Sequence, residues 1–180
     1  MPEVAIRPVV NGDLPDLMKY DLSYVSSRVW QMDRLSGDGM CGASFREIRL
    51  PREMKVEYPR SAAQIFGENQ DGQQLILGAF LDGVSVGYVR LSGQVSPRTA
   101  WVRDWAVHEK FRLKGIGSAL LMAVLEWSME QKYRRTVVEM QSKNFPAIQL
   151  ARKLGFEFAG FNDHYYSNQD IALFFARSLK

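Results

Sequence analysis

A strand followed by a glycine-containing turn and an apolar helix constrains this chain most, and it occupies residues 101–121, WVRDWAVHEKFRLKGIGSALL. The β-branched and aromatic residues at its start are typical of a strand, and Gly115 and Gly117 open the helix. The first turn of a helix has unpaired N–H groups and a partial positive charge, and glycine lets an anion approach the backbone closely. Arg112 and Lys114 add side-chain charge at the same place. The stretch therefore predicts a site for a phosphate-bearing ligand.

Length and composition predict one domain, residues 1–180, with a full hydrophobic core. The 23 basic and 20 acidic residues are interspersed, which does not indicate binding to nucleic acid. The longest apolar runs are shorter than the roughly 20 residues that span a membrane, and no signal peptide is recognised. The chain has a single cysteine, Cys41, which is typical of a protein in a reducing compartment. One cysteine and two histidines are too few ligands for a closed structural zinc site. We expect a cytoplasmic protein with no metal, nucleic-acid or membrane partner, and the sequence allows a homodimer.

The first half of the chain carries weaker patterns. Residues 4–10 predict a short strand that ends in a turn. Apolar residues at helical spacing, with Asp13 as an N-cap, predict one or two amphipathic helices from residue 13 to about residue 34. Residues 45–58 are charged and partly alternating, which predicts an exposed extended arm or hairpin whose acidic groups could select a cationic substrate. A further turn is expected at residues 69–72.

The second half alternates between strands and helices. Asp82-Gly83 is a strong hairpin signal between two apolar strands. The predicted strands are residues 75–81, 84–91, 99–107, 136–141, 156–166 and 170–178, and the predicted helices run from residue 116 to about 134 and from 146 to 154. This order favours a mixed α/β sheet.

Two motifs resemble those of a known family. Residues 112–117, RLKGIG, follow a strand and resemble the [Q/R]-x-x-G-x-[G/A] acetyl-CoA motif of the GNAT N-acetyltransferase superfamily. Residues 144–160, NFPAIQLARKLGFEFAG, resemble the second motif of that family, an Asn, an Ala and a terminal Leu-Gly-Phe. The two motifs stand in the usual order and at the usual separation, which makes the resemblance specific. The last third also resembles streptothricin-type acetyltransferases, and the segment at Ala106-Val107 resembles ribosomal-protein N-terminal acetyltransferases.

The resemblance implies a mixed, mostly antiparallel central sheet flanked by helices, with a splayed pair of parallel strands. Here those strands would be residues 99–107 and 136–141, and the pantetheine arm of acetyl-CoA would enter between them. N–H groups freed by the splay could also stabilise the oxyanion that forms during acyl transfer. The residues assigned to acetyl-CoA are Arg112, Leu113, Lys114, Gly115, Ile116, Gly117 and Ser118 around the pyrophosphate, the backbone of Trp105 and Val107, and the carboxamide of Asn144.

The resemblance also implies an N-acetyltransferase, in which a primary amine attacks the thioester of acetyl-CoA directly. The acceptor could be a small amine, an antibiotic or a peptide N-terminus. Many members carry a tyrosine that protonates the departing thiolate, and here that position is Ala151. Either Tyr165 or Tyr166 supplies the proton, or the thiolate leaves unaided. The alanine also keeps open a second interpretation, a non-catalytic acyl-CoA-binding or sensing module.

A general base is expected as well, because an alkylamine is almost wholly protonated at neutral pH. Asp104 and Glu139 are the candidates, and the alternation of each strand decides which of them faces the cleft. Plainer interpretations remain: Asp104 could form only a surface ion pair with Arg103, and the charges of the glycine turn could simply be solvated. By alternation, Trp101 and Trp105 lie on one face of their strand, where they are predicted to be core residues.

Overall fold

The computed structural model describes residues 4–67, 74–93 and 95–180, so the turn predicted at residues 69–72 lies outside the described residues. The strands are β1 (Ala5–Pro8), β2 (Tyr24–Gly37), β3 (Met40–Val56), β4 (Gln74–Leu81), β5 (Val84–Ser92), β6 (Thr99–Val107), β7 (Arg135–Gln141), β8 (Glu157–Asn162) and β9 (Ala172–Ser178). The helices are α1 (Leu14–Leu17), α2 (Ala62–Phe66), α3 (Ile116–Glu130) and α4 (Phe145–Lys153).

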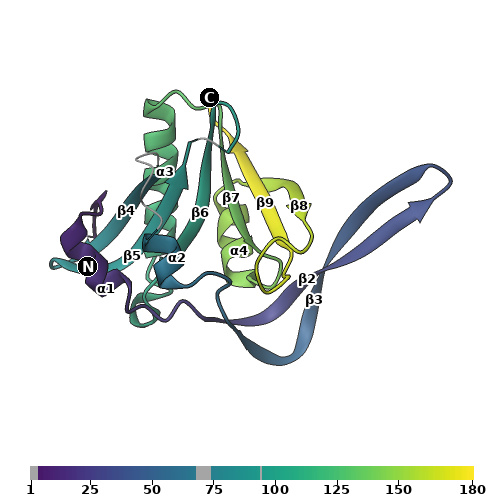
Figure 1. The fold of residues 1–180 in the computed structure, drawn as a ribbon, viewed down its shortest axis with the longest axis horizontal. Helices are drawn as coiled ribbons and strands as arrows, with labels where there is room; N and C mark the ends of the chain where they lie inside the picture. The colour runs from purple at the N-terminus through teal and green to yellow at the C-terminus, as the bar shows by residue number, and fades with distance from the viewer. Residues whose placement is uncertain (1–3, 68–73, 94) are drawn as a thin grey trace.

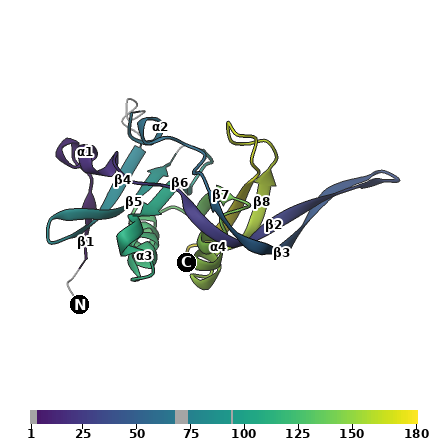
Figure 2. The ribbon, with the colours of Figure 1, turned by 90° about the horizontal axis from the view of Figure 1, so that it is seen from below.

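One seven-stranded sheet organises the molecule, in the order β1-β4-β5-β6-β7-β9-β8. Its pairs are antiparallel except for β6 and β7, which run parallel. The main core lies between one face of the sheet and α3 and α4, and a smaller core lies under α1 and α2 on the other face (Figures 1 and 2). The predicted mixed, mostly antiparallel sheet flanked by helices is confirmed.

The parallel strands β6 and β7 separate part of the way along the sheet. Their pairing begins at Thr99 and Arg135 and ends at Val102 and Val138, although both strands continue. Beyond that pair, β6 keeps only its antiparallel partner β5. The predicted splay is therefore present, and it exposes backbone hydrogen-bonding groups along the inner edges of both strands.

A bulge in β6 changes which side chains share a face. The register with β5 shifts between Leu91, which opposes Val102, and Arg90, which opposes Asp104. Such a bulge inserts one residue and inverts the alternation beyond it. Trp101 therefore lies on the α2 side, where it contacts Glu139, whereas Trp105 joins the main core under α3. The prediction that both tryptophans share one face is wrong.

The helices predicted from residue 13 to about residue 34 are also mostly wrong. Only α1 is α-helical there, and the chain enters strand β2 at Tyr24. β2 pairs with β3 over nearly its whole length, and this long-range partner decides the local structure. Asp13 precedes α1 without capping it, because its carboxylate accepts hydrogen bonds from Arg7 and from the Val10 N–H instead.

Strands β2 and β3 form a long hairpin that projects from the body, which we call the arm (Figure 1). The base of the arm is attached next to the end of β7: the backbone N–H of Trp30 donates to the Ser142 carbonyl at 2.9 Å. Farther out, the Phe45 ring packs on Phe158 and Phe161 of β8. The exposed hairpin predicted at residues 45–58 is confirmed, and it begins much earlier in the chain than the sequence indicated.

Candidate active site

The turn before α3 has the shape expected of an anion-binding site. Gly115 is the N-cap of this 15-residue helix and adopts φ +83°, a left-handed conformation that favours glycine. No atom would contact a Cβ placed on Gly115, so the backbone there is open to a ligand. Leu113 shares the left-handed conformation, and its side chain is fully exposed. The first N–H groups of α3 therefore face an unobstructed surface.

Gly117 has a different role from Gly115. A Cβ at Gly117 would come within 3.0 Å of Leu150 Cδ2 on α4, which is closer than side chains normally pack. Trp105 and Val107 of β6 lie 3.8 Å from the same point. Glycine here lets α3 approach α4 and β6, which fixes the helix N-terminus beside the end of the strand.

The two basic side chains of the turn are placed differently from one another. Arg112 is directed back into the protein, where its Nε donates to the Val107 carbonyl at 3.0 Å and its Nη2 to the Asp21 carbonyl at 3.1 Å. Lys114 is exposed, with its Nζ 5.3 Å from the centre of the Phe111 ring. Arg112 thus braces the turn, and Lys114 is the basic side chain of the two that can reach an anion in solvent.

The edge of β6 completes a surface that fits acetyl-CoA. In the described part of the chain, the pairing of β6 with β7 has ended before Trp105 and Val107, so an extended ligand can pair with the backbone there, except at the Val107 carbonyl, which already accepts from Arg112. Across the gap, Asn144 caps α4 by accepting a hydrogen bond from the Ala147 N–H at 3.2 Å. An open helix N-terminus for a pyrophosphate, followed by a free strand edge for an amide-containing arm, suits this cosubstrate.

Both candidate bases lie on the α2 side of the sheet, within one cluster of charges. The Asp104 carboxylate is fully buried and accepts hydrogen bonds from Tyr58 Oη (2.8 Å), Arg60 Nη1 (3.0 Å) and Arg90 Nε (2.7 Å). The interpretation of Asp104 as a surface ion pair with Arg103 is wrong: Asp104 is inaccessible, and Arg103 lies nearer to Glu139. Asp104 has no free oxygen directed toward solvent.

Glu139 follows the point at which β7 separates from β6. Its Oε1 accepts from Arg60 Nη2 at 2.5 Å, and its Oε2 accepts from Trp101 Nε1 at 2.6 Å and from the Tyr165 hydroxyl at 3.1 Å. The carboxylate is as buried as that of Asp104. Through Tyr165, however, it is connected to a residue that is only partly buried.

Tyr165 and Tyr166, the two candidate proton donors, differ in access. Burial and the neighbouring Glu139 raise the pKa of Tyr165 above its ordinary value, so its hydroxyl keeps its proton at neutral pH. Tyr166 is buried and packs edge-on against the Tyr165 ring. Ala151, at the position where the family resemblance implies a tyrosine, is fully buried in the main core. Of the two tyrosines, Tyr165 is the one whose hydroxyl contacts a candidate base.

Arg60 is a site residue that the sequence did not indicate. It stands in the loop before α2 and contacts both Asp104 and Glu139. Burial disfavours its charge, but the two carboxylates more than offset this, and the pKa of Arg60 lies above its ordinary value. Buried carboxylates require cationic partners, so a buried arginine could be expected. No motif marks which arginine it is, because its partners are 44 and 79 residues away along the chain.

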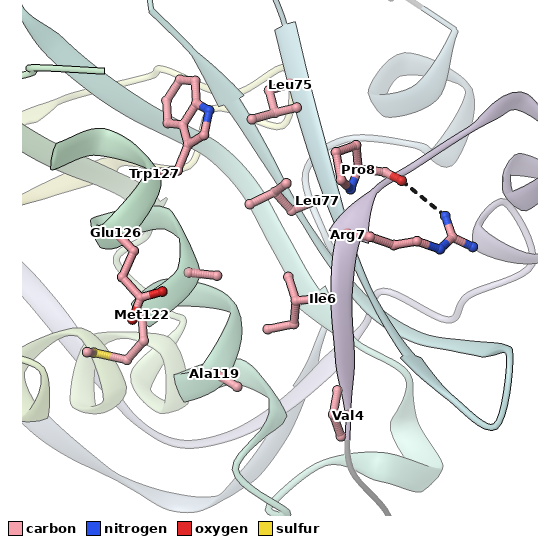
Figure 3. A pocket seen from close by; sticks show the side chains of 11 residues that line it. Val4, Ile6, Arg7, Pro8, Leu75, Leu77, Ala119, Met122, Glu126 and Trp127 are labelled. Atoms are coloured by element: carbon pink, nitrogen blue, oxygen red, sulfur yellow. Dashed lines mark hydrogen bonds between the residues drawn. The ribbon is translucent and has the colours of Figure 1, made fainter. Parts of the chain in front are cut away.

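A cavity elsewhere in the molecule contains none of these groups. It has a volume of about 550 Å³ and lies between β1, β4 and α3, where Ile6, Leu77 and Trp127 line it (Figure 3). Among the described residues, no group of three His, Cys, Asp or Glu side chains is placed to hold a metal ion. None of the helices described is long and apolar enough to cross a membrane.

Comparisons with known proteins agree with this geometry. The acetyltransferase (GNAT) family model matches residues 43–156. Streptothricin acetyltransferase A of Bacillus subtilis is 30% identical over 135 residues, which cover 73% of this chain and 77% of that protein. A crystal structure of nourseothricin acetyltransferase has a TM-score of 0.83 at 24% identity, with 98% of this chain and 99% of that chain covered. A putative streptothricin acetyltransferase from Bacillus anthracis str. Ames, solved in complex with acetyl coenzyme A, has a TM-score of 0.78 at 20% identity and 99% coverage of both chains.

Proposed function

This chain belongs to the GNAT acetyltransferase family and is an acetyl-CoA-dependent N-acetyltransferase, and we propose that its acceptor is a primary amine of streptothricin or of a compound in the same class. The observation that supports this acceptor is the similarity to streptothricin acetyltransferase A over most of both chains. The likeness to nourseothricin acetyltransferase, which covers 98% of this chain, extends over the arm. The alternative of a non-catalytic acyl-CoA-binding module is not supported.

Acetyl-CoA supplies an acetyl group already activated as a thioester, so the chain needs no nucleophile of its own. We assign the pyrophosphate to the backbone N–H groups of residues 113–118, with Lys114 adding charge from solvent. The pantetheine arm would pair with the backbone of Trp105 and Val107 and meet the amide group of Asn144 on the other side. This places the thioester near the separation of β6 and β7, where Glu139 lies.

Within this site we assign proton transfer to Tyr165 and Glu139. Tyr165 keeps its proton at neutral pH, and it donates that proton to the sulfur when the carbon–sulfur bond breaks. Glu139 accepts the proton that the attacking amine loses, through a water molecule, and returns it to Tyr165 through their hydrogen bond. The net result is one proton moved from nitrogen to sulfur for each acetyl group transferred.

We assign Asp104 a positioning role instead of the role of base. Its two oxygens accept hydrogen bonds from Tyr58, Arg60 and Arg90, and it is fully buried. None of these three donors is a group that we assign to proton transfer, so Asp104 has no connection to the reacting atoms through its hydrogen bonds. Glu139 differs because one of its donors, Tyr165, is itself a proton-transfer group at the partly exposed side of the cluster.

The test of the proposed acceptor is an assay of thiol release with purified protein, acetyl-CoA and streptothricin. We expect release that depends on the acceptor, with a streptothricin product heavier by one acetyl group. An L-amino acid and a short peptide with a free N-terminus serve as competing acceptors at equal concentration, and we expect both to be slower. Faster release with either competitor, or no release with streptothricin, would contradict the proposed acceptor while leaving the acetyltransferase activity unaffected.

A further inference from the structure

Arg60 spans the opening between the two separating strands. Its Nη1 donates to the Arg103 carbonyl at 2.9 Å and to Asp104 Oδ1 at 3.0 Å, both on β6. Its Nη2 donates to Glu139 Oε1 on β7 at 2.5 Å. These contacts begin directly after the last paired residues of the ladder, Val102 and Val138. One side chain thus replaces the backbone bonds that the strands no longer make.

We infer that Arg60 is a positioning residue that sets the separation of β6 and β7 and thereby the placement of Glu139 and Tyr165 for acetyl transfer. The inference uses the family's reaction and does not depend on which amine is the acceptor. It does depend on the assignment of Glu139 and Tyr165 to proton transfer.

The chemistry of the bridge requires a guanidinium. Its fork is planar and offers several donors in fixed directions, so it can bond to acceptors on two strands at once. A lysine ammonium carries the same charge but has a single nitrogen, which cannot reach both ends of this arrangement. The fork also lies over the neighbouring tyrosine rings, 5.1 Å from the centre of Tyr166 and 6.0 Å from that of Tyr165. Arg60 therefore joins β6, β7 and the loop that carries both tyrosines.

The Arg103 carbonyl shows why the bridge acts at this position. Arg103 is the extra residue of the β6 bulge, since Val102 and Asp104 take consecutive partners on β5. A carbonyl at such a bulge loses its ladder partner, and leaving it buried without a donor costs about 1–3 kcal/mol. Arg60 supplies the donor and, in the same contact, holds the bulge against Glu139 across the gap.

Three variants distinguish the effect of the two-ended hydrogen bonding of Arg60 from the effect of its positive charge. Arg60→Lys keeps the positive charge and removes the two-ended bridge. Arg103→Met removes a cation that lies 3.6 Å from Glu139 Oε2 and leaves the bridge intact. Arg60→Met removes both. Arg103 is about one-third exposed, so its loss is well tolerated by the fold and makes it a suitable comparison.

We expect Arg60→Lys and Arg60→Met to lower kcat about 10²-fold, the order of loss that follows a misplacement of about 1 Å. Calorimetric affinity for acetyl-CoA should fall much less than kcat, because the pyrophosphate site at the start of α3 lies outside the bridge. Hydrogen exchange should accelerate in residues 103–107 and 139–141 and stay unchanged in β4. Arg103→Met should lower kcat less and leave the exchange of both strands unchanged.

The exchange readout needs no acceptor, so it keeps this inference separate from the proposed substrate. Wild-type kcat and exchange in Arg60→Lys would overturn the inference, because charge alone would then suffice. An equal loss in Arg103→Met and Arg60→Met would overturn it for the same reason. If Arg60→Met fails to fold, Arg60→Lys still decides: a loss of kcat much larger than the loss of acetyl-CoA affinity supports the bridge, and normal turnover contradicts it.

Discussion

The Tyr165 hydroxyl lies 3.1 Å from Glu139 Oε2, just beyond the point where β6 and β7 part. The two residues come from different elements, a strand and the loop between β8 and β9, and the sheet brings them together. On this contact rests our proposal that Tyr165 is the proton donor in a chain that carries Ala151 at the position where the family resemblance implies a tyrosine. Of the two candidate bases, Asp104 on β6 and Glu139 on β7, only Glu139 contacts Tyr165 in the described structure.

Tyr165→Phe removes the proposed proton donor and keeps the ring. Loss of general acid catalysis typically costs 10²- to 10⁴-fold, and we expect kcat to fall by about 10²-fold, because a thiolate leaves more easily than most groups. Acetyl-CoA affinity should not change. Because the pKa of Tyr165 is raised above its ordinary value of 10.0, the donor stays protonated through the neutral range, and its contribution is lost only as the pH rises past that value.

Tyr166→Phe is the matched control. Its ring fills the same cluster, and the phenylalanine keeps the contact with the Tyr165 ring. We expect thiol release close to that of the wild type in steady-state assays. A larger loss of kcat in Tyr166→Phe than in Tyr165→Phe would contradict the assignment of Tyr165 as the proton donor.

Glu139→Gln and Asp104→Asn should fail in different ways. Glutamine at position 139 can still accept hydrogen bonds but cannot take a proton, so we expect kcat to fall. The unfolding temperature should fall less than in Asp104→Asn, because Arg60 keeps Asp104 as its charged partner. Asparagine at position 104 leaves two buried guanidinium groups facing a neutral side chain, and breaking a buried ion pair in this way costs about 3–5 kcal/mol. Calorimetric unfolding and thiol release, measured on both variants, check the division of roles. If Asp104→Asn is stable but inactive while Glu139→Gln remains active, the two roles are reversed, and Asp104 is the base.

Gly115→Asp tests the pyrophosphate site. Aspartate tolerates the left-handed conformation better than most residues and is a good helix N-cap, so we expect the fold to be retained. Its carboxylate would occupy the open space at the start of α3 and repel the pyrophosphate, and acetyl-CoA affinity should fall at least about tenfold.

Gly83→Asp is the comparison, because Gly83 has a similar φ of +80° in the β4–β5 turn and equally open surroundings. Its strain cost should match that of Gly115→Asp, whereas its acetyl-CoA affinity should equal that of the wild type. Calorimetric titration measures both. Equal affinities in the two variants would place the pyrophosphate elsewhere.

The ion pair between Arg7 and Asp13 makes part of the stability depend on pH. The hydrogen bond from Arg7 lowers the pKa of Asp13 below its ordinary value of 3.8. The folded state therefore gains stability above that value, and the gain is lost as the pH falls through the lower, folded pKa. Asp13→Asn should unfold at a lower temperature than the wild type at pH 7, and the difference should shrink in strong acid. A difference that stays constant with pH would contradict this.

The sequence predicts the second half of the fold well because its signals are local. Asp82-Gly83 fixes the hairpin, the bounds of β6 agree with those predicted, and α4 has a proline in its first turn and ends shortly before a glycine. In the first half, apolar residues from Leu14 to Val29 fit a helical spacing, yet those in β2 form a strand because β3 pairs with them. Long-range pairing of this kind leaves no local mark in the sequence.

The candidate site also has one part that local sequence signals predict and one part that they do not. The residues around Gly115 can be located from their motif because a helix N-terminus and its glycine are adjacent in sequence. The cluster on the other face cannot, because the bulge at Arg103 inverts the alternation and brings Asp104 to the side of Glu139. Arg60 enters that cluster from a loop with no motif. Only the folded sheet brings these residues together.

Hydrogen exchange measured with and without acetyl-CoA tests the central claim most directly, namely that the cosubstrate binds between the start of α3 and the free edge of β6. The account predicts slower exchange of the amides in residues 113–118 and 105–107 when acetyl-CoA is bound, and no change in β1, which lines the separate cavity. Protection confined to β1 and the outer face of α3, with none at residues 113–118, would contradict it.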